Sequence, residues 1–231
     1  MKLSIIIPAF NEEMVIKETI AEVFTFFKTT GVDLEVIVVD DGSTDKTKEL
    51  VRAELEKYPE LKLLANEYNS GKGYSVKKGA LSASGDWILF LDADLSTRPE
   101  EFAKFKPHLG AADIIIGSRD VNGSQILKKQ RLFRRLSSKF LKALIKLFVN
   151  LGYPDTQCGF KCFSRKSLII FSEQQTNRWM FDLELLALAK KHGLRVVEVP
   201  VNWTNDESST VKAKDIFNIL RDLMIIKKQS L

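Results

Sequence analysis

WILFLDAD, residues 87–94, is the segment that decides the fold and points to the chemistry. Its first five residues are continuously apolar, which predicts a short strand buried on both faces, and two aspartates follow at once. Such strands occur mainly in parallel sheets that helices cover on both sides, and ligands bind beyond the carboxyl ends of these strands. Asp92 and Asp94 therefore stand where a parallel sheet places a ligand.

The same pattern repeats on both sides of this segment. Helical spacing of apolar residues alternates with further apolar runs, and Asn11 is expected to cap the first helix. The other predicted strands are residues 3–8, 34–39, 61–65, 113–117 and 196–199, and a loop is expected over 155–161. This alternation predicts an α/β fold with a mostly parallel central sheet and helices on both faces.

Composition is typical of an ordinary globular protein: 231 residues, 45% hydrophobic and 28% charged. No linker rich in Pro, Gly or Ser divides the chain, so we expect a single domain over residues 1–231. No stretch approaches the ~20 apolar residues that span a bilayer, so we expect a cytoplasmic protein without a transmembrane helix. Cys158 and Cys162 have no neighbouring His or further Cys, and we expect reduced, partly buried thiols.

Four groups of polar residues follow successive predicted strands. Residues 8–12 offer an aromatic ring and polar groups, Asp40-Asp41 offers acceptors for nucleoside donors, and residues 69–73 offer the parts of an anion site. Asp92 and Asp94 are hard oxygen ligands that suit Mg²⁺ or Mn²⁺ shared with substrate phosphates. Each group alone is also compatible with a plain turn or a solvated loop. Together they predict one cleft for a nucleotide diphosphate and a metal ion.

These segments resemble the family-2 glycosyltransferases, which have the nucleotide-sugar-binding GT-A fold. Residues 117–119, 134–139, 155–163 and 178–184 extend the resemblance, which covers roughly residues 1–205. The similarity is greatest to the polyprenyl-phosphate (dolichyl-phosphate) glucosyltransferase branch, with the mannosyltransferases beside it. It implies metal-dependent, inverting transfer of a hexose, by preference glucose from UDP-glucose, to a polyprenyl or dolichyl monophosphate.

The resemblance also assigns roles to individual residues. The nucleotide sugar is expected to contact Pro8, Phe10, Asn11, Glu12, Asp40, Asp41, Gly71, Lys72, Asp92, Ala93 and Asp94. Asp92 and Asp94 are expected to hold the Mg²⁺ or Mn²⁺, and the acceptor phosphate is expected to contact Arg119, Arg134, Ser138 and Gln157. The expected catalytic residues are Asp94, Arg119, Arg134 and Asp182, although Asp182 and Glu184 are equally compatible with structural roles.

Residues 121–150 contain eight Lys or Arg and no acidic residue, in a chain whose net charge is +5. We expect an amphipathic basic helix over about 126–150 and a second amphipathic helix over about 212–228. A solvated surface helix or a nucleic-acid site would use the same charge, but no nucleic-acid motif accompanies it. Binding to an anionic membrane surface fits best, because an apolar stripe runs beside the positive charges. We therefore expect peripheral association with the cytoplasmic face of a membrane, and no nucleic-acid partner.

The expected acceptor is already an anion at neutral pH, so its oxygen can attack without a strong general base. Three alternatives stay open. The donor could be GDP-mannose, the acceptor could be a hydroxyl group on a glycan or protein, or the chain could be a catalytically silent nucleotide-binding module at a membrane surface. The sequence does not predict the oligomeric state.

Overall fold

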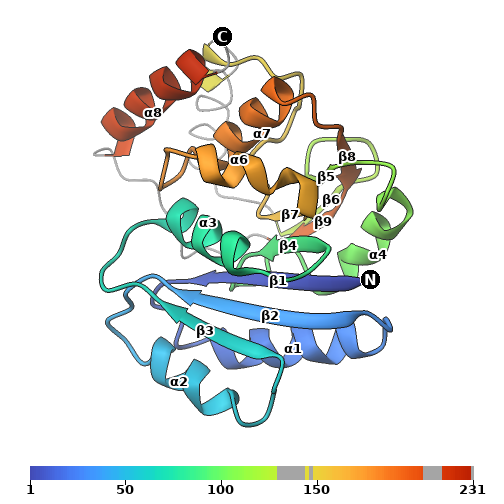
Figure 1. Ribbon diagram of the computed structural model, residues 1–231, viewed down its shortest axis with the longest axis vertical. Helices are drawn as coiled ribbons and strands as arrows, with labels where there is room; N and C mark the ends of the chain where they lie inside the picture. Colours follow the sequence, from blue (N-terminus) through green and yellow to red (C-terminus); the bar gives the residue numbers. More distant parts are fainter. Residues whose placement is uncertain (129–143, 146–147, 205–214, 230–231) are drawn as a thin grey trace.

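A seven-stranded sheet forms the centre of the protein, with the strand order β3-β2-β1-β4-β7-β5-β8 (Figure 1). The structure is a computed structural model and describes residues 1–128, 144–145, 148–204 and 215–229. The strands of the sheet are β1 (Lys2–Ala9), β2 (Asp33–Asp40), β3 (Leu61–Ala65), β4 (Trp87–Leu91), β5 (Ile114–Ser118), β7 (Phe160–Ser164) and β8 (Val196–Pro200). A separate parallel pair consists of β6 (Gln125–Lys128) and β9 (Asn202–Thr204). Among the strands of the described residues, only the two pairings of β7 are antiparallel, so the prediction of a mostly parallel sheet is confirmed.

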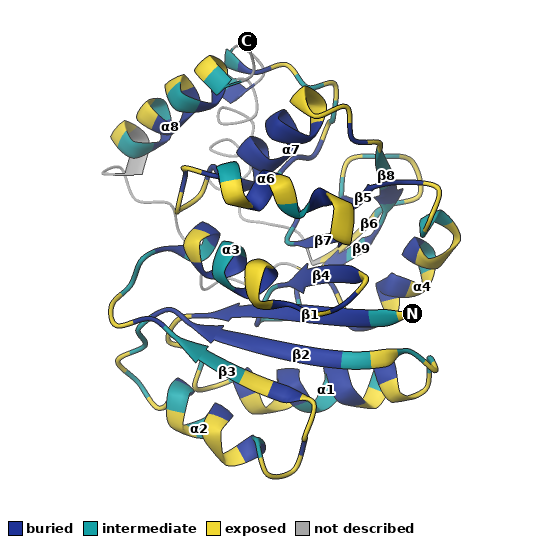
Figure 2. Ribbon diagram, viewed as in Figure 1, coloured by how far each residue is buried: buried dark blue, intermediate teal, exposed yellow. Residues whose placement is uncertain are grey.

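Helices cover both faces of the sheet, as the sequence predicts (Figures 1 and 2). One face carries α1 (Ile16–Lys28), α2 (Thr47–Glu54) and α4 (Phe102–Phe105), and the other carries α3 (Lys72–Ser82), α6 (Leu168–Glu173) and α7 (Phe181–Lys191). Short 3₁₀ helices are η1 (Pro99–Glu101), η2 (Lys106–His108) and η3 (Arg165–Ser167). Along β1, Ile5 and Ile7 pack toward α1 whereas Ile6 packs toward α3, which is the alternation that a strand buried on both faces requires.

The expected loop over 155–161 ends two residues earlier than predicted, because strand β7 begins at Phe160. The strand lies between β4 and β5, so that Cys162 is opposite Leu89 on one side and Ile115 on the other. The sequence did not reveal it because Lys161 interrupts its apolar residues and because an inserted antiparallel strand breaks the regular alternation. Its position brings residues 155–161 to the end of β4, where the acidic pair lies.

The first helix also begins later than expected, at Ile16 rather than directly after Asn11. Asn11 is not its N-cap; it has a left-handed backbone, with φ 57°. Its Oδ1 accepts a hydrogen bond from the backbone N of Thr44 at 2.9 Å, and its own N donates to Ser43 Oγ at 3.0 Å. Asparagine tolerates the left-handed conformation, and its side chain often bonds to nearby backbone in turns. These properties explain why Asn11 lies in a turn and does not cap the helix. Asn11 therefore ties the β1–α1 loop to the β2–α2 loop.

The two amphipathic helices are described only in part. Residues 125–128 form β6 instead of the start of a basic helix, and Arg134 and Ser138 lie outside the described residues. The C-terminal helix is present as α8 (Asp215–Gln229), which buries Ile219, Leu223 and Ile226 against α7. None of the helices in the described part of the chain has the length and apolar character needed to cross a membrane.

Candidate active site

The four polar groups meet at one edge of the sheet, as predicted. Parallel pairing sets Ala9, near the end of β1, opposite Asp40 at the end of β2, and β4 ends beside them. Hydrogen bonds and an ion pair join the groups in sequence order: Asn11 to Thr44, Asp41 to Gly71, and Lys72 to Asp92. The contacts follow from the topology, because parallel strands present their carboxyl ends at the same edge.

Lys72 and the acidic pair form the centre of this edge. The Lys72 ammonium forms an ion pair with Asp92 Oδ1, and the two side chains are 32% and 29% exposed. Burial opposes the charge of Lys72, but the carboxylates of Asp92 and Asp182 outweigh it and raise its pKa. Burial and the charge of Asp92 raise the pKa of Asp94, against a hydrogen bond from Ser96 N at 2.8 Å. The site thus holds a concentrated negative charge that Lys72 only partly offsets.

Asp92 and Asp94 fit a divalent cation that takes its remaining ligands from a substrate. Within the described residues, no group of three His, Cys, Asp or Glu side chains is arranged as a complete metal site. Mg²⁺ and Mn²⁺ are commonly held by one or two carboxylates together with phosphate oxygens and water, so two carboxylates are sufficient. The raised pKa of Asp94 marks a place where added positive charge is favourable.

The backbone part of the predicted anion site is already occupied. Asp41 accepts hydrogen bonds from the backbone N of Ser70 at 3.0 Å and of Gly71 at 2.8 Å, and Tyr74 N donates to Asn177 O at 3.1 Å. The carboxylate of Asp41 is thus the anion at the start of α3. Asp41 lies far from these N–H groups in the sequence but adjacent to them in the fold, so the backbone N of Ser70 and of Gly71 already has an acceptor within the protein, and phosphate binding by residues 69–73 stays a prediction.

Asp40 differs from its neighbour. Its side chain is 1% exposed, and among the described residues neither carboxylate oxygen has a hydrogen-bond partner. Buried carboxylates are normally paired, and one without a donor is energetically unfavourable. This makes Asp40 a fitting acceptor for donor groups of a bound ligand.

Asp182 lies at the start of α7 and forms an ion pair with Lys161. Lys161 is completely buried and also donates to the carbonyl of Cys158 at 2.5 Å. Burial raises the pKa of Asp182, although Lys161 and Lys72 act in the opposite direction. Asp182 therefore borders the site, since its carboxylate influences Lys72.

Glu184, the other acidic residue on α7, has a structural role. Its carboxylate accepts hydrogen bonds from Gln175 N at 2.8 Å, Thr176 N at 2.7 Å and Thr176 Oγ1 at 2.5 Å. These contacts fix the loop that precedes α7, and the carbonyl of Asn177 in that loop accepts from α3. The alternative left open by the sequence is thus resolved for Glu184.

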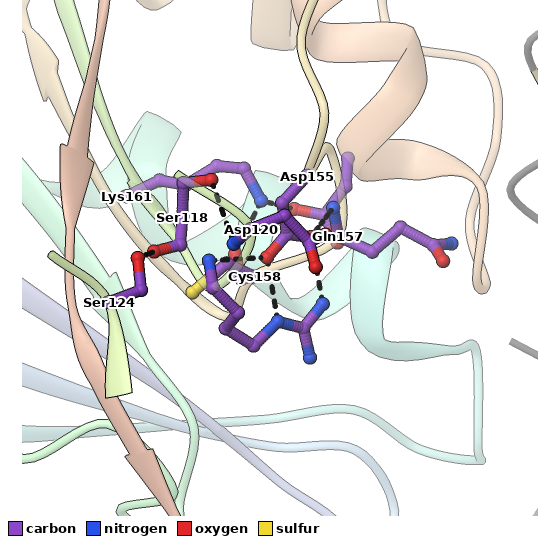
Figure 3. Close-up of polar contacts among 9 residues, drawn as sticks. Ser118, Asp120, Ser124, Asp155, Gln157, Cys158 and Lys161 are labelled. Atoms are coloured by element: carbon purple, nitrogen blue, oxygen red, sulfur yellow. Dashed lines mark hydrogen bonds and ion pairs between the residues drawn. The ribbon is translucent and has the colours of Figure 1, made fainter. Parts of the chain in front are cut away.

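Arg119 and Gln157 are brought together by Asp155, as Figure 3 shows for Asp155 and Gln157. Arg119 donates from Nε at 2.7 Å and from Nη2 at 2.8 Å to Asp155, and Gln157 N donates to the same carboxylate at 3.2 Å. Burial opposes the charge of Arg119, but Asp155 raises its pKa overall. Its guanidinium also lies 5.3 Å from the centroid of the Trp203 ring. Arg119 is therefore a permanently charged group with a fixed orientation.

Comparison with known proteins decides the family. The family model "Glycosyl transferase family 2" matches residues 4–170. This chain belongs to glycosyltransferase family 2. The enzyme is 34% identical to dolichyl-phosphate beta-glucosyltransferase ALG5A of Trichomonas vaginalis, over 97% of this chain and 72% of the relative. It is 31% identical to dolichyl-phosphate beta-glucosyltransferase of Saccharomyces cerevisiae, over 97% of this chain and 74% of the relative.

Solved structures confirm the fold of the glycosyltransferase. Glucosyl-3-phosphoglycerate synthase from Mycobacterium tuberculosis in complex with UDP superposes with a TM-score of 0.69 at 18% identity, covering 99% of this chain and 80% of that one. The same synthase in complex with Mn²⁺, UDP and glucosyl-3-phosphoglycerate gives a TM-score of 0.67, covering 97% and 78%. The GT-A fold expected from the sequence is therefore confirmed.

Two residues of the glycosyltransferase site were not assigned a role from the sequence. A Cβ atom added to Gly159 would lie 2.0 Å from Asp92 Oδ2, so any larger residue here would displace the Asp92 carboxylate. Lys161 pairs with Asp182. Both belong to the motif over 155–163 that carries the family resemblance, but their contacts depend on the insertion of β7 beside β4. No spacing in the sequence reveals that insertion.

Proposed function

We propose that this glycosyltransferase transfers glucose from UDP-glucose to a polyprenyl or dolichyl monophosphate, with inversion at the anomeric carbon. The observation that carries the proposal is the Lys72–Asp92 ion pair beside Asp94, at the edge where the ends of β1, β2 and β4 meet. The sugar and the acceptor are supported by relatives that align with nearly the whole chain and are named dolichyl-phosphate beta-glucosyltransferases.

On the donor side, Asp92 and Asp94 would hold Mg²⁺ or Mn²⁺, which when bound neutralises the negative charge of the departing diphosphate. Lys72 supplies a second positive charge next to them. Asp40 offers its unpaired carboxylate to the nucleoside. The remaining nucleotide-sugar contacts are proposed for Pro8, Phe10, Asn11, Glu12, Asp41, Gly71 and Ala93 at the same edge.

On the acceptor side, Arg119 attracts and orients the lipid phosphate. Asp155 fixes the guanidinium through two hydrogen bonds. Because the Arg119 side chain is already ordered, it loses less conformational entropy when it binds a phosphate. Gln157 lies beside them, and Arg134 and Ser138 are proposed to complete this side. Because the acceptor oxygen is already negatively charged, catalysis consists mainly of holding two anionic reactants in line.

The acceptor is a lipid, so we propose peripheral binding to the cytoplasmic face of an anionic membrane. The exposed side of α8 supports this assignment: Phe217 is 77% exposed and Met224, two helical turns later, is 59% exposed. Lys227 and Lys228 follow in the last turn of the helix. Apolar side chains next to lysines are typical of helices that bind anionic lipid surfaces.

The test offers radiolabelled UDP-glucose, other UDP-sugars and GDP-mannose separately with polyprenyl phosphate, with and without a chelator of divalent metals. We expect label from UDP-glucose in the lipid phase, loss of transfer with chelator, and recovery with added Mg²⁺ or Mn²⁺. If only GDP-mannose delivers label to the lipid phase, the donor is GDP-mannose and not UDP-glucose. Transfer to a glycan or protein without lipid would contradict the proposed acceptor.

A further inference from the structure

We propose that Lys161 is a positioning residue of the donor site. Lys161 pairs with Asp182, so that Lys72 stays paired with Asp92. The charge of Lys161 thereby determines how tightly the site binds a divalent cation relative to a diphosphate. The inference deepens the proposed function and rests on it, because it assumes that the acidic edge binds a metal ion and a nucleotide diphosphate.

The surroundings of Lys161 show that its positive charge is paired with the Asp182 carboxylate. The side chain is fully buried in the middle of the sheet, on β7. Its ammonium contacts the Asp182 carboxylate and donates to the carbonyl of Cys158. A buried ammonium is unfavourable unless it is paired, so this lysine is present at a position where an apolar residue would otherwise be expected. Figure 3 shows Lys161 beside Cys158, in the segment that also contains Asp155.

The two lysines of the site belong to one electrostatic group. The ammonium of Lys161 lies 5.3 Å from the centroid of the Phe90 ring, and that of Lys72 lies 5.9 Å from the same centroid. Lys72 is influenced by both Asp92 and Asp182. The group contains three carboxylates, with Asp94 as the third, and two ammonium groups, which leaves one negative charge in excess.

Removal of the Lys161 charge changes this group in a definite direction. One negative charge in excess becomes two, because Asp182 keeps its charge by attracting Lys72 away from Asp92. A site that is more negative binds a divalent cation more tightly and a diphosphate anion more weakly. These two effects have opposite signs. A loss of packing or of local order weakens the binding of both ligands, so the signs separate a charge-balancing role from a purely structural one.

The experiment compares the intact protein with Lys161→Met, which preserves most of the side-chain volume. Calorimetry measures Mn²⁺ binding without nucleotide and UDP binding without metal, at low ionic strength. For Lys161→Met we expect the Kd for Mn²⁺ to fall about threefold to tenfold and the Kd for UDP to rise by a similar factor, as expected for one charge in a partly solvated site. Asp182→Asn is expected to shift both constants in the opposite directions.

Two further variants make the comparison specific. Lys166→Met removes the same charge from a side chain that is 70% exposed and paired with Asp113 at 3.5 Å, and we expect both Kd values within twofold of the parent. The double variant Lys161→Met with Asp182→Asn restores the charge balance, so both Kd values should return toward those of the parent. This rescue is not expected from a packing defect.

Each outcome is decisive. If Lys161→Met weakens both ligands, or changes neither while the parent binds both, the inference is overturned and the proposed function stands. If Lys161→Met does not yield folded protein, Asp182→Asn decides: tighter UDP binding with weaker Mn²⁺ binding supports the inference, and any other pattern overturns it. If the parent itself binds neither Mn²⁺ nor UDP, even when the two are offered together, the proposed function fails.

Discussion

Both edges of the central sheet bury carboxylates next to lysines, but the hydrogen-bond donors and the pKa of these carboxylates differ between the two edges. At the amino-terminal edge, Glu35 accepts hydrogen bonds from Ser4 Oγ, Lys62 Nζ and the backbone N of Ser84. Burial opposes its charge, but these donors outweigh burial and lower its pKa from 4.5 to about 2. At the carboxyl-terminal edge, burial raises the pKa of Asp94 and Asp182, and Asp40 has no donor among the described residues.

The difference separates a structural carboxylate from those of a binding site. Glu35 is fully satisfied by the protein, so its charge stabilises the folded state and offers nothing to a ligand. Asp40 and Asp94 at the other edge are incompletely satisfied, so bound cations and hydrogen-bond donors would improve their environment. Incomplete satisfaction is therefore a better guide to the site than burial, because the carboxylates at both edges are buried or partly buried.

The largest expected effect is on activity at the carboxyl-terminal edge. Asp94→Asn removes a proposed metal ligand, and we expect glucosyl transfer to fall by a factor on the order of 10² to 10³. Its stability should be unchanged or slightly higher, because the variant relieves repulsion from Asp92. Transfer assays and urea unfolding measure the two quantities. If Asp94→Asn keeps half of the activity, the carboxylates at this edge do not form the binding site, and the contrast with the structural carboxylate Glu35 is contradicted.

The opposite result is expected at the amino-terminal edge. A pKa lowered from 4.5 to about 2 corresponds to about 3 kcal/mol of stability, so Glu35→Gln should lower the free energy of unfolding by roughly that amount with little change in transfer. Because the folded-state pKa is the lower one, this stability is complete above about pH 5 and is lost as the pH falls toward 2. Unfolding at pH 7, 4 and 2.5 should show the difference from the parent shrinking. A constant difference would contradict the assignment.

Gly159→Ala tests how closely the acidic pair is held. The added Cβ would lie 2.0 Å from Asp92 Oδ2, so the carboxylate must move, and we expect a loss of transfer of about tenfold or more. Gly117→Ala is the matched control, since the nearest atoms to its Cβ would be Phe160 O, Val201 Cγ1 and Cys158 Sγ at 3.1 to 3.2 Å, and none of them belongs to Asp92. Equal losses of activity in the two variants would show that general packing, and not Asp92, is responsible.

The smallest effect concerns the two thiols beneath the site. Both cysteines are free and buried, and burial together with Asp155 raises the pKa of Cys158 to about 11. Burial also raises the pKa of Cys162. Neither thiol should react with a thiol reagent at pH 8 in the folded protein, and both should react after denaturation. Rapid reaction of one thiol in the folded protein would show that solvent reaches the buried cysteines and would contradict this prediction.

Most of the strands, and the meeting of the candidate site residues at one edge of the sheet, could be predicted from the sequence. Continuous apolar runs identified β1, β2, β3, β4 and β5, because strands buried on both faces are apolar throughout. The aspartates after β2 and β4 could be placed at one edge for the same topological reason. Strand β7 and the true position of Asn11 could not be predicted, since each depends on a partner segment distant in the sequence.

The sequence by itself determined that this protein has a mostly parallel α/β sheet with an acidic edge, because the order of apolar and polar residues along each strand is local information. The nucleotide sugar as ligand came from the family resemblance. The tertiary structure alone decided which partner each charged group meets: Asp41 accepts a hydrogen bond from the backbone N of Gly71, 30 residues away, and Lys161 pairs with Asp182, 21 residues away. The physical reason is that charge pairing depends on distance in space. The insertion of β7 beside β4 sets that distance for Lys161 and Gly159.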